Sequence, residues 1–514
     1  MLTGECRRRP RRTPWSRAIA RGWLVVGLLV VGTPALLAAH PALRRSVPAA
    51  GDTLTAPPRA LRLTFSEAIE ASLSSIMLLG PGDDTVRLSA PRPDAADPSV
   101  VTVSVMDSAP APGRYAVVWK VTGPDGHPVR GRFSFVLVSS PPAAPAPTSP
   151  PGGEAGAGVP APGQPSPPAE HHPDETFPAD EARFGVESPA YVAVRWLVFA
   201  SLLALLGVVG FEYLVVRMVR RRAAPGSESA LAIARARAAR LGLAAAGLLL
   251  FSVAGRLVAQ SVSMHEPGEV LDTALLSAML FRTMWGWGWL LQLAAAALAL
   301  GAVLRVRRAP ERRWTPALLA GLVLSVTPAL AGHATAVTGY GPIPVLADSL
   351  HVLGAGSWLG ALLVLVVAGL PAAMRQDAAE RGPLVAELVN AFSPVALFFA
   401  GLVATTGVFS AWLHLGTVAE LWQSAYGRTL LIKLAVLAVV AGTGFYNWRR
   451  VRPALGDEVG TRRVRRSSTV ELVVAAAVIL VTAVLVAMPP PADVTANAAH
   501  AVSVPTIPPP EVLR

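Results

Sequence analysis

Residues 115–138 read YAVVWKVTGPDGHPVRGRFSFVLV, which is the pattern of two β-strands joined by a turn. Apolar side chains take every second position before and after the turn: Tyr115, Val117, Trp119 and Val121, then Phe133, Phe135 and Leu137. A period of two gives each strand one apolar face, and Asp-Gly is a common hairpin turn. The stretch therefore predicts an antiparallel hairpin within an all-β domain.

Three further runs of the same kind precede this hairpin, at residues 61–65, 74–79 and 100–106. Pro, Gly, Asp and Ser separate the runs at spacings typical of an antiparallel sandwich. We therefore expect residues 40–138 to form an all-β, immunoglobulin-like sandwich outside the membrane.

The remainder of the chain has the composition of a membrane protein. Of the 514 residues of the whole chain, 52% are hydrophobic and only 15% are charged, and the mean hydropathy of the chain is +0.48. Several apolar runs are long enough to cross a bilayer. Residues 190–488 are expected to form an all-α polytopic bundle of about eight helices. The expected spans are 191–216, 241–260, 285–304, 315–332, 344–369, 390–412, 429–447 and 468–488. The third expected span, 285–304, could begin earlier in the sequence, or a separate interfacial segment could precede it.

The net charge of +12 comes from basic clusters between these spans rather than from one continuous patch. The clusters lie at 217–240, 305–313, 374–381 and 449–466, and they alternate with loops poor in Lys and Arg. The positive-inside rule places these four loops in the cytoplasm. The β-domain and the tail, residues 489–514, then lie outside the plasma membrane. This distribution indicates a lipid bilayer, and not nucleic acid, as the partner of the basic residues.

Two segments flank the β-domain. Residues 1–39 resemble a secretory signal peptide with a basic start and an apolar core, although an uncleaved anchor is the alternative. Residues 139–189 are rich in Pro, Ala and Gly and are expected to form an extended linker. A linker of this kind raises the concentration of the β-domain near the membrane, where it could dock on its own membrane domain.

The turn of the hairpin carries candidate metal ligands. If the signal is cut after Ala39, the mature chain begins with His40, whose amine and ring nitrogen can chelate one ion. Asp125 and His127 stand at i and i+2, so an extended segment aims both side chains the same way. Nitrogen and oxygen ligands together suit Cu(II). The alternative is an ordinary hairpin turn with an exposed histidine, and the spacing favours neither.

The predicted spans hold a second set of candidates. None of the nine histidines falls in a predicted cytoplasmic loop. Asp348 and His351 are three residues apart, and so share a face of the fifth span. Among the remaining candidates, His333 ends the fourth span and His414 the sixth, and the neighbours Met264 and His265 lie in the outer loop after the second span. Imidazole, thioether and carboxylate would suit a copper pathway, whereas capping and packing of the bundle is the alternative for Asp348 and His351.

These residues also carry a family resemblance. The segments HPALRRSVPAAGDTLTAPPRALRLTFSEAI and YAVVWKVTGPDGHPVRGRFSFVL resemble the periplasmic copper-binding CopC family. The segments AGHA, DSLHVLGAGSWLG, FSPVALFFAGLVATTGVFSAW, YGRTLLIKLAVL and RRSSTVELVVAAAVILVTAVL resemble the CopD family of copper-resistance membrane proteins. Together the two resemblances cover most of the chain, as in a CopC–CopD fusion.

The resemblance implies a cupredoxin-like domain that holds Cu(II) through His40, Asp125 and His127. Some CopC proteins carry a Met-rich loop for Cu(I), whereas here Met77 and Met106 are unclustered. We expect a non-enzymatic protein that captures Cu(II) outside the cell and supports copper import, homeostasis and resistance, with Cu(I) as a second form in the membrane domain. The alternatives are a membrane-anchored copper-buffering metallochaperone and a redox protein binding haem through histidines such as His351 and His414.

Overall fold

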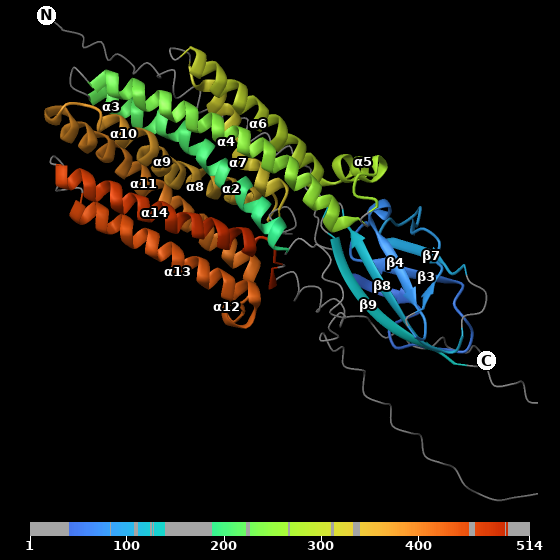
Figure 1. Cartoon of the computed structure of the whole chain (residues 1–514). Coiled ribbons are helices and arrows are strands. Elements are labelled where there is room, and N and C mark those ends of the chain that lie inside the picture. The colour runs from blue at the N-terminus through green and yellow to red at the C-terminus, as the bar shows by residue number, and fades with distance from the viewer. Residues whose placement is uncertain are drawn as a thin grey trace, which may run out of the picture. The chain divides into compact units, whose positions relative to one another are not determined.

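The computed structural model divides the chain into two compact units, one of strands and one of helices, and each is described by itself (Figure 1). The description covers residues 41–82, 84–106, 111–123, 126, 128–138, 188–222, 227–265, 268–309, 313–332, 340–451, 458–488 and 490–491.

The first unit is a sandwich of two sheets, as expected. One sheet has the strand order β1-β3-β7-β6 and the other β2-β9-β8-β4-β5. All neighbours pair antiparallel except β2 and β9, which are parallel. The strands are β1 (Leu43–Val47), β2 (Thr53–Leu54), β3 (Ala60–Phe65), β4 (Ser75–Leu79), β5 (Thr85–Val86), β6 (Arg92–Pro93), β7 (Val100–Ser104), β8 (Gly113–Thr122) and β9 (Pro128–Leu137). Five of them are the predicted runs, and the short strands β1, β2, β5 and β6 were not predicted.

The apolar residues of the hairpin form the core of this sandwich. Phe65 meets the ring of Trp119 edge-on, with ring centroids 5.2 Å apart. Trp119 lies opposite Gly131 in the β8–β9 register, and a Cβ at position 131 would overlap its indole ring. Tyr115 stacks on Phe135 with centroids 5.5 Å apart, and burial raises the pKa of its hydroxyl. The predicted inward face of the hairpin is therefore confirmed.

The second unit is a bundle of long helices. Seven of them are long and apolar enough to cross a membrane among the described residues, and α7, at 16 residues, is a shorter apolar helix in place of the fourth expected span, 315–332. The elements are α2 (Pro189–Gly210), η2 (Phe211–Val216), α3 (Arg217–Arg222), α4 (Ser227–Met264), α5 (Thr273–Arg282), α6 (Met284–Arg308), α7 (Thr315–Leu330), α8 (Ile343–Ala355), η4 (Gly356–Gly360), α9 (Ala361–Val364), η5 (Leu365–Gly369), α10 (Leu370–Ala373), α11 (Ala378–Leu415), α12 (Glu420–Gln423), α13 (Ala425–Tyr446), η6 (Asn447–Val451) and α14 (Glu458–Leu485).

The region of the third expected span contains two helices. Asp272 caps α5 by accepting hydrogen bonds from the backbone N–H groups of Ala274 and Leu275. Thr283 then ends α5 and caps α6, because its hydroxyl accepts a hydrogen bond from the backbone N–H of Gly286 at 3.1 Å. Two caps within eleven residues break the apolar stretch, so a separate short helix precedes the span.

Consecutive long helices run antiparallel. Polar contacts link the start of one helix to the end of its neighbour: Gln292 donates to Thr327 at 3.1 Å between α6 and α7, and Arg235 of α4 pairs with Glu212 of η2 at 3.0 Å. The basic segments that follow α2, α6, α10 and α13 therefore lie at one end of the bundle, which we call the arginine end. We call the opposite end, where α4 and α11 finish and α8 starts, the histidine end.

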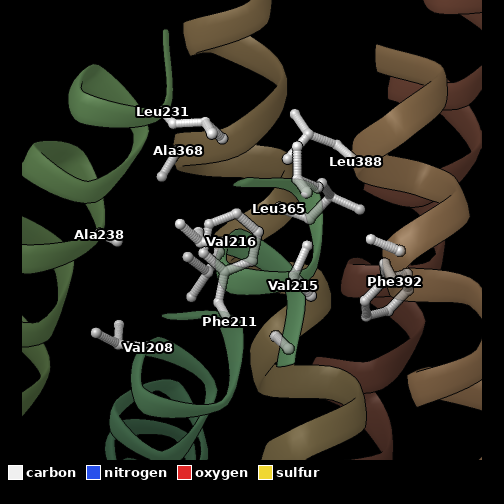
Figure 2. Close-up of a cluster of buried hydrophobic side chains, with 14 of the residues drawn as sticks. Val208, Phe211, Val215, Val216, Leu231, Ala238, Leu365, Ala368, Leu388 and Phe392 are labelled. Carbon is white, nitrogen blue, oxygen red and sulfur yellow. The ribbon is translucent and has the colours of Figure 1, made fainter. Parts of the chain in front are cut away.

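Tight packing holds α2 against the segment after α8. Gly356 and Gly360 stand four residues apart in η4, and an added Cβ at Gly360 would collide with the backbone of α2 at Leu203 and Gly207. Small residues at this spacing allow helix backbones to approach closely in a membrane. Toward the arginine end, Phe211 and Val215 lie among buried side chains of α4, η5 and α11 (Figure 2).

Candidate metal centre

The predicted ligands of the β-domain, His40, Asp125 and His127, lie outside the described residues, so their assignment stays a prediction. The structure does describe the frame that carries the turn. β8 and β9 stay paired to their last residues, Thr122 opposite Pro128. The Thr122 hydroxyl is buried and donates to the Leu73 carbonyl at 3.1 Å. A turn anchored in this way connects two long strands, so its ends have a fixed separation.

The helical unit brings Asp348 and His351 of α8 against the end of α11. The Ser410 hydroxyl donates to Asp348 Oδ1 at 3.5 Å, and His351 Nδ1 lies 3.0 Å from the Thr406 hydroxyl oxygen. Gly407 makes room for the imidazole, since a Cβ there would come to 3.3 Å from His351 Cε1. The predicted shared face of Asp348 and His351 is thus turned toward a row of polar groups on α11.

The hydrogen bonds fix the tautomer of the His351 ring. The Thr406 hydroxyl donates to the Leu402 carbonyl at 2.7 Å, because a carbonyl oxygen can only accept. Its oxygen must then accept from His351, so Nδ1 carries the hydrogen. In the neutral ring Nε2 keeps its lone pair and can bind a metal. An outer hydrogen bond of this kind orients a metal-ligating histidine and raises its basicity.

His414 follows the same rule one helical turn beyond Ser410. Its Nδ1 lies 2.7 Å from the Ser410 carbonyl oxygen, which can only accept, so Nδ1 is again the donor. The Tyr426 ring of α13 lies beside it, with centroids 6.4 Å apart. Thr406, Ser410 and His414 stand at intervals of four and so form one row along α11. This spacing is visible in the sequence, although only His414 was chosen from it.

Lys433 of α13 is a further charged residue of this region. From the sequence it lies near the outer end of a span, which predicts an ammonium group that reaches the interface and orients the helix. In the structure the side chain is half-buried and lies within electrostatic range of Asp348 and His351. A carboxylate, two histidines and a lysine therefore share one polar region between α8, α11 and α13. We call Asp348, His351, His414 and Lys433 the α8–α11 cluster.

Met264 and His265 lie at the end of α4, also at the histidine end but outside the α8–α11 cluster. The Met264 side chain is buried, and the Gln260 amide donates to its sulfur at 3.4 Å. The Ser261 hydroxyl donates to the Val270 carbonyl at 2.7 Å and so accepts from His265 Nδ1 at 3.0 Å. Each described histidine of the bundle thus uses Nδ1 as a hydrogen-bond donor within the helical unit.

The candidate ligands do not form one closed site within the described residues. There, no three His, Cys, Asp or Glu side chains are placed to hold a single metal ion. His333, expected at the same end of the bundle, lies outside the described residues.

Comparison with known proteins gives three family matches in chain order. Residues 43–138 match the CopC domain, residues 186–343 the copper resistance protein D-like N-terminal domain, and residues 386–485 copper resistance protein D. The chain belongs to the CopC and CopD copper-resistance families.

Individual relatives cover both units of this CopC–CopD chain. The copper transport protein CutJ of Bacillus subtilis is 25% identical over 82% of this chain and 70% of its own length. Copper resistance protein C of Escherichia coli is 32% identical over 22% of this chain and 94% of its own length. Copper resistance protein D of Pseudomonas syringae is 26% identical over 56% of this chain and 93% of its own length. The protein is a multi-pass membrane protein with a copper-related function.

Proposed function

We propose that this protein captures Cu(II) outside the plasma membrane and supports its import. The β-domain would hold the ion through His40, Asp125 and His127, and the histidine end of the bundle would receive it. The observation that carries this proposal is the α8–α11 cluster. It combines Asp348 with two histidines whose Nδ1 atoms are already used as donors.

The cluster has the features of a transfer site. A storage site would enclose the ion with a full ligand set, whereas a pathway must release it, and the described residues offer ligands in small groups. Imidazole serves both Cu(II) and Cu(I), and the thioether of Met264 favours Cu(I). Ionisable groups within spans are costly, so their gathering between three helices is itself a sign of function.

The proposed orientation, with the histidine end outside, rests on charge. The arginine end collects the basic segments, and the positive-inside rule assigns such segments to the cytoplasm. The histidine end then faces outward, on the same side as the β-domain and the C-terminal tail. The β-domain would dock there transiently, because its linker keeps it close to the bundle.

Cellular copper content tests the proposal. Cells lacking the protein would receive the intact chain, a His351→Ala variant or a His127→Ala variant under limiting external copper. We expect the intact chain to raise internal copper and His351→Ala to abolish the rise. His127→Ala should reduce the rise at low external copper and spare it at high copper, where capture is no longer limiting.

Two controls separate this proposal from its alternatives. Glu269→Gln changes an exposed acid in the turn after α4, at the same end of the bundle, and should leave uptake intact. An absorbance spectrum of the purified protein should lack a Soret band, which bis-histidine haem would produce. Unchanged or lowered internal copper with the intact chain would instead favour export or buffering at the outer surface.

A further inference from the structure

The outer face of the five-stranded sheet carries a group of exposed cations. Side chains at alternate positions of β8 and β9 point away from the core, and Arg114, Arg130 and Arg132 among them are exposed. Lys120 shares this face. Among the described residues of β8, β9 and β4, none of the outward positions is acidic. We call Arg114, Lys120, Arg130 and Arg132 the basic face.

The register places two of these cations directly opposite each other. Lys120 pairs with Arg130 across β8 and β9, which lie side by side in Figure 1. Like charges in directly opposite positions destabilise a sheet. A face of this kind is suited to an anionic ligand.

A groove lies at one edge of the basic face. It encloses about 270 Å³ and is lined by Leu79, Gly80, Pro81, Gly82, Arg114, Ala116, Arg132 and Ser134. Two guanidinium groups and a hydroxyl supply hydrogen-bond donors, and the leucine, the proline and the alanine supply an apolar floor. None of the described lining residues is a carboxylate; the nearby Asp84 lies in the β4–β5 turn. Planar guanidinium groups bind carboxylates in a bidentate manner.

The chain itself contains a segment of complementary chemistry. Residues 170–181 read EHHPDETFPADE and include five acidic residues. Residues 139–169 contain one acidic residue, Glu154. One residue, Thr176, separates the adjacent acids Asp174 and Glu175 from the aromatic Phe177. This order matches a groove with two arginines above an apolar floor. We call residues 170–181 the acidic segment.

The linker is long enough for the acidic segment to return to the groove. β9 ends at Leu137, so Ser134 lies roughly 13 Å before the linker begins, at about 3.3 Å per strand residue. The stretch from Val138 to Asp174 is about 36 residues, and as an extended Pro-rich segment with about 3.1 Å per residue it reaches up to roughly 110 Å. The groove is within this reach, and the tether gives an effective concentration in the millimolar range.

We infer that the acidic segment docks in the groove of the basic face. Asp174 and Glu175 bind Arg132 and Arg114, and Phe177 covers the floor at Leu79 and Pro81. Docking leaves only the residues after 181 as a free tether before α2 begins at Pro189. The segment thus shortens the working linker and limits how far the β-domain moves from the membrane. This inference is independent of copper capture.

Cross-linking of the full chain in nanodiscs tests it. Ser134→Cys in the groove and Thr176→Cys in the acidic segment are joined by a short bis-maleimide, with Cys6→Ser removing the native thiol. Thr102→Cys on the other sheet replaces Ser134→Cys in the control pair. We expect efficient cross-linking of the groove pair and a roughly tenfold lower yield for the control pair.

Charge reversal identifies the groups that hold the segment. Arg132→Glu, or Asp174→Arg with Glu175→Arg, should each lower the groove yield by about tenfold, and their combination should restore most of it. The inference is overturned if neither charge reversal changes the cross-linking yield of the groove pair, or if that yield equals the yield of the control pair. A yield that disappears when the discs contain anionic lipid overturns it as well, because the arginines then hold headgroups.

Discussion

His351 of α8 and Thr406 of α11 are joined by a hydrogen bond of 3.0 Å between the ring Nδ1 and the hydroxyl oxygen. The hydroxyl is committed to the Leu402 carbonyl as a donor, so it can only accept from the ring. One threonine thereby sets the tautomer of a histidine on another helix and leaves the lone pair of the ring on Nε2.

Replacing that hydroxyl should impair copper uptake. Thr406→Val keeps the shape of the side chain but removes the acceptor, so the His351 ring loses its preferred tautomer and orientation. Loss of such an outer hydrogen bond costs about 10- to 100-fold in metal affinity or activity. Internal copper in cells expressing the variant is the measurement. Thr405→Val is the matched control, because that exposed hydroxyl bonds only within its own helix. Equal loss in both variants would remove Thr406 from the pathway.

Lys433 should oppose metal binding in the α8–α11 cluster. Its positive charge acts on Asp348 and His351 and therefore repels a copper ion held by them. Lys433→Met should tighten copper binding by roughly three- to tenfold, which corresponds to about 1 kcal/mol. Copper titration of the purified protein in a His127→Ala background would measure this change. Arg428→Gln, an exposed cation on the same helix, should have no effect. Weaker binding in Lys433→Met would show that the lysine orders the ligands.

Gly131→Ala should destabilise the β-domain selectively. The added methyl group would overlap the Trp119 ring on the buried face of the hairpin. Overpacking of this kind costs about 1–3 kcal/mol. Pulse proteolysis of the full chain in increasing urea would report the stability of the β-domain. Ser134→Ala on the outward face of the same strand is the control. A midpoint unaltered by Gly131→Ala would mean that the indole moves aside without cost.

The long elements were predictable because their patterns repeat. Alternating apolar residues at seven core positions predicted β8 and β9, and long apolar runs predicted the membrane spans. The short strands β2, β5 and β6 have two residues each, which is too few to show a period. The break before α6 depends on the Thr283 cap, and the apolar pattern around it left two interpretations open.

The candidate site was predictable only in part. Asp348 and His351 could be selected from the sequence, because a carboxylate and an imidazole one helical turn apart are unusual within a span. The partners on α11 depend on which helices pack together, and helix spacing alone carries no such information. Lys433 illustrates the same limit, since its position on α13 is known from the sequence but the groups that its ammonium approaches are set by packing.

The arginine end should depend on one buried ion pair. Glu212 is 3% exposed and accepts from Arg235 at 3.0 Å, with Arg217 at 3.8 Å. Glu212→Gln removes the charge that balances two cations, and breaking such a partly buried pair should cost about 1–3 kcal/mol. Size-exclusion profiles after heating in detergent would show a lower midpoint. Glu228→Gln, an exposed acid at the start of α4, should not change it. A similar midpoint for both variants would show that the pair contributes little.

Copper flux into sealed vesicles tests the proposed import most directly. Purified protein would be reconstituted with its β-domain outside, and copper entering the lumen would be measured by elemental analysis after the external ion is removed. We predict time-dependent accumulation with the intact chain, and accumulation at the level of protein-free vesicles with Asp348→Asn combined with His351→Ala. Equal accumulation by the intact chain and the double variant would contradict a copper pathway through the α8–α11 cluster.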